Sequence, residues 1–350
     1  MADFRTKRCG TFGTEYRTLN EEGKNVAHCY VTSNCWDGNQ AIVTARLPSL
    51  KDSSCSYVWT NLESGEERLL CEGGVGTDFT VRNGKLYHVE GDRYLATEIS
   101  TGTTSILWEA PYPLVGPISI TNDGQFGAAC WRYEDGSYSI GRINLLTGSH
   151  EEFHRQSFPP PFNEISHCMP SPVDPNHMFF CHEGNCCYIT NRLWMTDVIN
   201  GKTENIFRQR LDQDGNNGEC CGHEMWSPDG NGLYFVKYIS ATIEPRGVWY
   251  IDRETHKTGS VASGGKYWHV GVSPDGNRLA ADTQVPGRFS DVVLIDQAME
   301  LEIPLVRAET NWVHPCHPHP VFSPDGKKLC FTMLNEAGNT CVAIVDLPEK

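Results

Sequence analysis

The chain has 350 residues, of which 39% are hydrophobic and 21% charged, with 33 glycines and 20 prolines. This composition excludes a disordered chain and predicts a globular protein rich in turns. Its formal charge is −15 and it has no cluster of lysines and arginines, which excludes nucleic acid as a partner. The sequence also lacks a signal-peptide pattern and an apolar window of membrane-spanning length. We therefore expect a cytoplasmic protein without a membrane partner.

A turn that leads into an apolar strand recurs along the chain. In the clearest copies the turn is Ser-Pro-Asp-Gly, in which proline presets φ, aspartate bonds its own backbone and glycine takes the left-handed conformation. Seven copies spaced 39 to 55 residues apart predict an all-β, seven-bladed β-propeller with one four-stranded blade per repeat. In chain order the turns are 36–38, 82–84, 122–124, 172–175, 227–230, 273–276 and 323–326.

Further apolar runs predict the outer strands of the blades, at residues 139–145, 193–196 and 248–252. No stretch of ten residues keeps a helical period, so helices are expected to be minor. No linker or charge block interrupts the chain. The prediction is therefore one propeller domain over residues 1–350.

Fifteen cysteines are present, an odd number without paired Cys-x-x-Cys spacing. We therefore expect reduced thiols rather than a disulfide framework. Two pairs are adjacent, Cys186-Cys187 and Cys220-Cys221. Neighbours on a strand point to opposite faces and do not match zinc-ligand spacing, which favours buried, inert thiols.

Histidines gather before the last turns of the repeat. His314, His317 and His319 lie within six residues, among prolines that favour an extended backbone. On an extended strand His317 and His319 would point the same way, with His314 reaching in from the preceding loop. His223 and His269 each precede a Ser-Pro-Asp-Gly turn. The pattern predicts a central divalent-metal site of neutral imidazoles, although single histidines in such positions can also serve only to pack blades.

Four stretches carry a further signal: Phe180–Gly184 with Arg192–Trp194 after it, Gly222–Trp226, the turn at His269, and His317–Pro320. In order and approximate spacing they resemble the oligogalacturonate lyases, seven-bladed propellers that cleave short pectin fragments by metal-assisted β-elimination. The likeness extends over most of the chain. It implies a small acidic oligosaccharide of the digalacturonate class as substrate.

The resemblance implies a manganese site. Its ligands would be His317 and His319, the blade histidine His269, and the residue three positions before the pair. That position holds His314 here, whereas the family has a glutamine. An imidazole is softer than an amide oxygen, which keeps zinc, iron, cobalt and nickel as alternatives to manganese.

The resemblance also implies His223 as the catalytic base and Arg192 as the substrate-binding arginine. The C5 proton of a uronate is too weakly acidic to leave unless the adjacent carboxylate is neutralised, which a metal and an arginine do. A histidine with a pKa of about 6.5 is an uncharged base at neutral pH. Four more residues fall on similar positions and are predicted to bind the sugar: His182, Glu183, His28 and His167. His182 and Glu183, as strand neighbours, should face opposite sides.

Two alternatives stay open. The first is a related lyase that acts on another uronate-containing oligosaccharide, such as one with glucuronate, which the departure at His314 allows. The second is a TolB-like propeller that binds a partner and uses its histidines only as blade anchors. The sequence does not indicate an oligomeric state.

Overall fold

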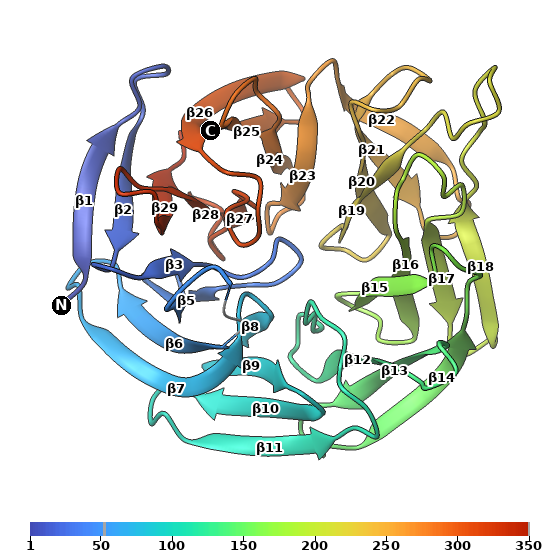
Figure 1. Ribbon diagram of the computed structural model, residues 1–350, viewed down its shortest axis with the longest axis horizontal. Helices are drawn as coiled ribbons and strands as arrows, with labels where there is room; N and C mark the ends of the chain where they lie inside the picture. Colours follow the sequence, from blue (N-terminus) through green and yellow to red (C-terminus); the bar gives the residue numbers. More distant parts are fainter. Residues whose placement is uncertain (52–53, 349–350) are drawn as a thin grey trace. The chain divides into compact units, whose positions relative to one another are not determined.

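The computed structural model describes residues 1–51 and 54–348. Within these ranges every regular element is a β-strand, and none of the described segments forms a helix able to cross a membrane. The 29 described strands form seven sheets of three to five strands each (Figure 1). The predicted all-β, seven-bladed β-propeller class is confirmed.

The chain divides into two compact units. Unit 1 comprises residues 1–88, 96–105 and 268–350, and unit 2 comprises residues 89–95 and 106–267. One sheet, in the order β11-β10-β9-β8, supplies residues to both units. Its strands are β8 (Phe79–Arg82), β9 (Lys85–Glu90), β10 (Arg93–Glu98) and β11 (Thr104–Glu109). The single domain over residues 1–350 stays a prediction.

In unit 1, the two ends of the chain share a sheet. Strand β2 pairs with β29, with Arg17 opposite Ile344, so the N-terminal hairpin completes a sheet made by the C-terminal strands (Figure 1). Backbone hydrogen bonds thereby tie the two ends to each other. The strands are β1 (Asp3–Arg8), β2 (Glu15–Asn20), β27 (Val321–Phe322), β28 (Lys328–Leu334) and β29 (Thr340–Asp346).

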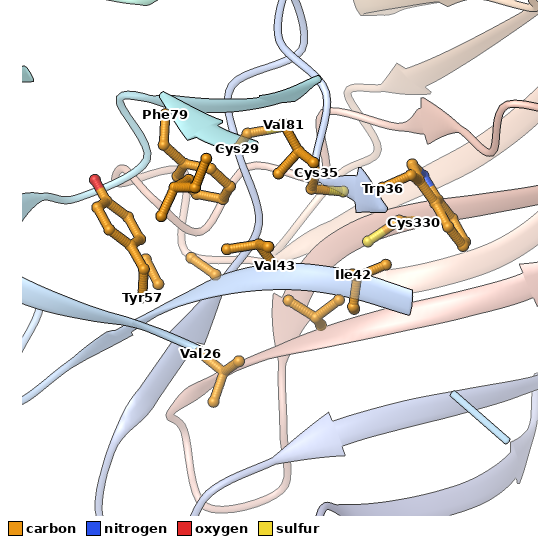
Figure 2. Close-up of a cluster of buried hydrophobic side chains, with 14 of the residues drawn as sticks. Val26, Cys29, Cys35, Trp36, Ile42, Val43, Tyr57, Phe79, Val81 and Cys330 are labelled. Carbon is orange, nitrogen blue, oxygen red and sulfur yellow. The ribbon is translucent and has the colours of Figure 1, made fainter. Parts of the chain in front are cut away.

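Two further sheets lie in unit 1, apart from Tyr267, the first residue of one of them, which belongs to unit 2. Apolar residues of one of them, among them Val26, Ile42, Val43 and Tyr57, are fully buried and pack with Phe79 in one cluster (Figure 2). The strands of that sheet are β3 (Asn25–Ala27), β4 (Trp36–Asp37), β5 (Ala41–Leu47), β6 (Ser54–Asn61) and β7 (Glu67–Val75). The other consists of β23 (Tyr267–Val272), β24 (Arg278–Thr283), β25 (Phe289–Asp296) and β26 (Leu301–Glu309).

Unit 2 holds three sheets of its own. Phe179, Phe235 and Ile251 are fully buried in one of its clusters and form a core separate from that of unit 1. The first sheet is β12 (Phe126–Arg132), β13 (Tyr138–Asn144) and β14 (His150–Gln156). The second is β15 (Glu164–Pro170), β16 (His177–Glu183), β17 (Leu193–Asp197) and β18 (Lys202–Phe207). The third is β19 (Cys221–Trp226), β20 (Gly232–Lys237), β21 (Gly247–Asp252) and β22 (Thr258–Ser263).

The repeated turns form as predicted. In the turn before β20, the Ser227 hydroxyl donates to Asp229 Oδ1 at 2.6 Å, the same oxygen accepts from the Asn231 amide at 3.1 Å, and Gly230 has a φ of 70°. The same serine–aspartate bond recurs before β24 and β28. The four weaker copies lead into β5, β9, β12 and β16. Each of the seven sheets therefore has one strand that follows a copy of the turn.

The segment that carries three histidines is not an extended strand. Residues 310–320 lie between β26 and β27 without regular structure, and the Cys316 amide donates to the Val313 carbonyl in a turn. His319 has a φ of 45°. The prediction of an extended backbone is wrong here, because prolines lack the N–H groups that would pair the segment with a neighbouring strand.

Candidate functional site

Three buried imidazoles converge in unit 1. His269 lies on β23, whereas His317 and His319 come from the segment before β27. One ligating nitrogen from each lies within 4.8 Å of the others, and His319 Nε2 is 2.9 Å from His269 Nε2. The side chains are 0%, 8% and 4% exposed, respectively. The fold thus brings His269 next to His317 and His319, predicted metal ligands that lie far from it in the sequence.

A buried carboxylate orients this cluster. Asp282 on β24 accepts from His269 Nδ1 at 2.8 Å and from the backbone amides of His269 at 2.8 Å and His319 at 3.1 Å. With Nδ1 as donor, the Nε2 lone pair of His269 is available to a ligand. Burial raises the pKa of Asp282 to about 6, against the pull of those amides, so the carboxyl is ionised at neutral pH.

The donor set fits a divalent cation. Neither ring nitrogen of buried His317 has a hydrogen-bond partner among residues 1–51 and 54–348. Such orphaned polar atoms are costly unless a ligand satisfies them. Burial and the neighbouring imidazoles lower the pKa of His319 well below its usual value, which keeps it neutral and able to donate a lone pair. Three imidazole nitrogens suit a first-row divalent ion.

Two more predicted residues lie beside the cluster in unit 1. His28 is 1% exposed and holds the backbone, since its Nε2 lies 2.7 Å from the His319 carbonyl and its Nδ1 lies 2.6 Å from Thr332 Oγ1. His314 is exposed, with its ring centroid 4.2 Å from that of His317. Its nitrogens are not part of the three-imidazole group. His314 therefore stays a predicted ligand.

A charged network in unit 2 contains the predicted arginine. Arg192 follows β16 and is 5% exposed. Its Nη2 donates to Glu183 Oε1 at 2.9 Å, and its Nε lies 3.4 Å from Glu224 Oε1. Burial alone would raise the pKa values of both carboxyls, but Arg192 and His167 hold them below the ordinary value. The guanidinium is thereby fixed between two ionised carboxylates.

His167 closes this network from β15. Its Nδ1 lies 3.0 Å from Glu224 Oε2, and Ser166 Oγ donates to Glu183 Oε1 at 2.8 Å. The pairing register of β15 with β16 shifts beside His167, where φ is 52°. This bulge turns the imidazole towards the carboxylates. His167 thus contacts protein carboxylates here, and sugar binding by it stays a prediction.

His223, the predicted base, occupies an equivalent bulge on β19. Its φ is 54°, and the register with β20 shifts between Gly222 and Met225. The half-buried ring meets Tyr238 edge-on at 5.4 Å and lies 6.4 Å from the His167 ring. A Cβ on Gly222 would come within 2.8 Å of Arg192 Nε and 2.2 Å of Tyr238 Oη. Glycine at this position therefore lets the arginine approach the strand that carries the base.

His182 and Glu183 face different partners, as predicted. The His182 ring stacks on Phe158 at 3.6 Å, and its Nε2 lies 2.7 Å from the Phe162 carbonyl. Glu183 instead belongs to the Arg192 network. His182 therefore packs apart from that network.

Residues 139–291 match the model of a family described as oligogalacturonate lyase. The predicted resemblance to the oligogalacturonate lyases is confirmed. An oligogalacturonide lyase of Pectobacterium atrosepticum is 23% identical over 374 residues, covering 94% of this chain and 92% of the relative. An oligogalacturonate lyase of Dickeya dadantii is 25% identical over 209 residues, covering 55% of this chain and 51% of the relative.

The fold of an oligogalacturonate lyase matches as well. A solved structure of such a lyase in complex with manganese has a TM-score of 0.86 and 19% identity, and covers 99% of this chain and 97% of its own. At this identity the match shows the fold alone. The family model and the two relatives indicate that the chain is a lyase.

The oligogalacturonate lyase resemblance missed two carboxylates that organise the clusters, Asp282 and Glu224. A spacing in the sequence could have drawn attention to the neighbours of these carboxylates. Four histidines each stand four residues before the serine at the turn of their own sheet. The four are His167, His223, His269 and His319. No comparable signal marks Asp282, whose role depends on the fold of β24 beside β23.

Proposed function

We propose that this chain is a metal-dependent lyase that cleaves short oligogalacturonides by β-elimination. The observation that carries the proposal is the buried group of His269, His317 and His319, in which His317 has two orphaned ring nitrogens. A propeller that used its histidines only as blade anchors would satisfy these nitrogens within the protein. The family resemblance supplies the substrate class.

The metal ligands would be His269, His317 and His319, with His314 as a fourth. Manganese is the first candidate because an oligogalacturonate lyase of the same fold holds it. When bound, a divalent cation would neutralise the uronate carboxylate next to C5 and so make the C5 proton more acidic. Asp282 keeps His269 in the tautomer that can ligate.

Arg192 would bind the substrate carboxylate from the charged network. Glu183 and Glu224 fix its guanidinium through Nη2 and Nε. Its Nη1 makes only a long contact of 3.4 Å with the Gly184 carbonyl and remains a donor for an anionic group. Because Arg192 is already paired with Glu183 and Glu224, its main contribution would be to orient the substrate carboxylate rather than to supply net positive charge.

His223 would act as the base. Its neutral imidazole takes the C5 proton, the electron pair of the C5–H bond forms the C4–C5 double bond, and the C4–O4 bond breaks. The departing oxygen would take up a proton that the protonated His223 gives back, directly or through solvent, so the base is regenerated and no water is consumed. The products are a shortened sugar and a 4,5-unsaturated uronate.

The test follows ultraviolet absorbance of the unsaturated uronate with di- and trigalacturonate, after chelation and after manganese is added back. A rise that depends on manganese is expected. A sample that contains bound metal but gives no rise would contradict the galacturonate assignment, and glucuronate-containing oligosaccharides would then be assayed in the same way. A sample that binds no metal would overturn the lyase proposal and favour a binding propeller.

A further inference from the structure

A cluster of three thiols lies in unit 2, outside both groups described above. Cys186 and Cys187 follow β16, and Cys220 precedes β19. Their three sulfurs lie within 4.8 Å of one another, and Cys187 Sγ is 3.7 Å from Cys220 Sγ. Cys186 and Cys187 are only half-buried, so the prediction of buried thiols is wrong for this pair. Cys221 instead packs in the core of unit 2.

The backbone around the cluster holds the thiols together. Asn217 Nδ2 donates to the carbonyls of Cys186 at 2.6 Å and Ile189 at 2.7 Å. Cys220 Sγ lies 3.3 Å from the Asn217 carbonyl. The two hydrogen bonds of buried Asn217 thus join the loop that follows β16 to the loop before β19, so the convergence of the sulfurs does not depend on exposed side chains.

We propose that Cys186, Cys187 and Cys220 form a thiolate site for Zn²⁺. A zinc–sulfur distance of about 2.3 Å in a tetrahedron sets neighbouring sulfurs about 3.8 Å apart, close to the separation that Cys187 and Cys220 already have. Three thiolates leave one coordination position. Because Cys186 and Cys187 are partly exposed, solvent can fill it, and Ser240 Oγ lies 3.9 Å from Cys186 Sγ.

Three sulfurs distinguish this site from a simple redox pair. A disulfide would join two of the thiols and leave the third without a role, whereas a soft cation uses all three. The bound ion would also cross-link two loops, one of which runs on to Arg192. Zinc at this site would therefore fix the position of that arginine. The proposal does not depend on the imidazole cluster.

The experiment uses the whole chain, chelated and kept reduced, and titrates it with Co²⁺ as a spectroscopic substitute for zinc. Thiolate ligands give an intense sulfur-to-cobalt charge-transfer band that imidazole ligands lack, so the thiol site is read separately from the histidines. We expect this band to reach the intensity of one thiolate-bound Co²⁺ per chain, while Co²⁺ at the imidazole site adds nothing to it, and to disappear when Zn²⁺ is added. Binding should release protons, because thiols must ionise to ligate.

The variants are Cys186→Ser, Cys187→Ser and Cys220→Ser. Each should lower zinc affinity at least tenfold and remove or shift the band. The matched control is Cys71→Ser, which changes another half-buried thiol in unit 1. The two partly exposed positions keep the test interpretable even if Cys220→Ser fails to fold. A reduced chain without the band, or an unchanged band in Cys187→Ser, would overturn the proposal. So would a metal-free sample, purified without reductant, that has lost two of its fifteen thiols to a disulfide.

Discussion

His223 combines a left-handed backbone conformation with a half-buried ring, and it stands outside the metal-ligand group. If it is the base, its removal should leave metal binding intact. We expect His223→Ala to lower the rate of elimination by about 10²–10⁴-fold, the usual contribution of general base catalysis. The measurement is the initial rate with digalacturonate, together with metal content by mass spectrometry.

A matched control for this substitution is His154→Ala. His154 is a partly buried residue of β14, and its ring is hydrogen-bonded to the Gln156 side chain. Its loss should change neither the rate nor the metal content. Wild-type turnover in His223→Ala would remove His223 from the mechanism, and a loss of bound metal would reassign it as a ligand.

The role of Asp282 in orienting His269 can be tested by a single substitution. Its carboxylate accepts from two backbone amides and from His269 Nδ1. An asparagine has one accepting oxygen, so at least one of these donors would face an NH₂ group. We expect Asp282→Asn to weaken manganese binding by about 10–100-fold, as for other residues that orient ligands. Competition with a chromophoric chelator measures this, with exposed Asp346→Asn as the control. Unchanged affinity would show that the carboxylate does not orient His269.

The sequence could predict the histidines of the site but not their carboxylate partners. His317 and His319 were found because they lie two residues apart, and His269 because it precedes a turn. Their contacts with Asp282, and those of Arg192 with Glu224, depend on how separate strands are placed. The bulge at His223 could not be predicted either, since its positive φ breaks the alternation that strand patterns rely on.

Strand β23 and the segment before β27 approach closely at Gly271. A Cβ at this position would lie 2.4 Å from the Pro320 carbonyl oxygen, which is backbone and cannot turn aside. We expect Gly271→Ala to separate the two elements, to destabilise the protein by about 1–3 kcal/mol and to weaken metal binding, since His269 and His319 lie on the two sides of this contact. Urea unfolding and the manganese titration measure both effects.

Gly259→Ala is the matched control for Gly271. Gly259 lies on β22, and a Cβ there would meet no atom within 4 Å. The control should keep wild-type stability and affinity. If Gly271→Ala behaved in the same way, the close approach would not be needed to position the histidines.

Elements with a local chemical signature were predicted best. The Ser-Pro-Asp-Gly turns form through contacts among neighbouring residues, so β20, β24 and β28 follow them as expected. The segment over residues 310–320 was predicted wrongly as extended. Its conformation depends on prolines without N–H donors and on the buried bond between Thr310 and the Cys316 carbonyl. Such a bond has no repeating sequence pattern.

For the whole molecule, the buried apolar cores described for residues 1–51 and 54–348 are each built from more than one sheet, and the cores around Val26, Phe331, Phe235 and Ile140 contain none of the three imidazoles. The N-terminal strands β1 and β2 complete a sheet with β28 and β29, so backbone hydrogen bonds tie both ends of the chain. The number of sheets could be predicted because each copy of the turn starts one strand. The grouping of the chain into two units could not, since no composition change marks it.

Because these cores do not contain the imidazole cluster, we expect removal of the metal to abolish activity but not the fold. A ligand present at a hundred times its Kd adds about 2.7 kcal/mol to stability, which amounts to a few degrees in Tm for a chain of this size. We therefore expect a chelated sample to lose turnover, to keep its β-sheet circular dichroism, and to unfold a few degrees lower in a cooperative transition. Because chelation also strips the thiol site, His317→Ala provides an arm in which only the imidazole site is impaired, and it should reproduce the loss of turnover with the same folded spectrum. Loss of the cooperative transition in both samples would mean that the imidazole cluster, together with its ion, holds β23 against the segment before β27 and is part of the core.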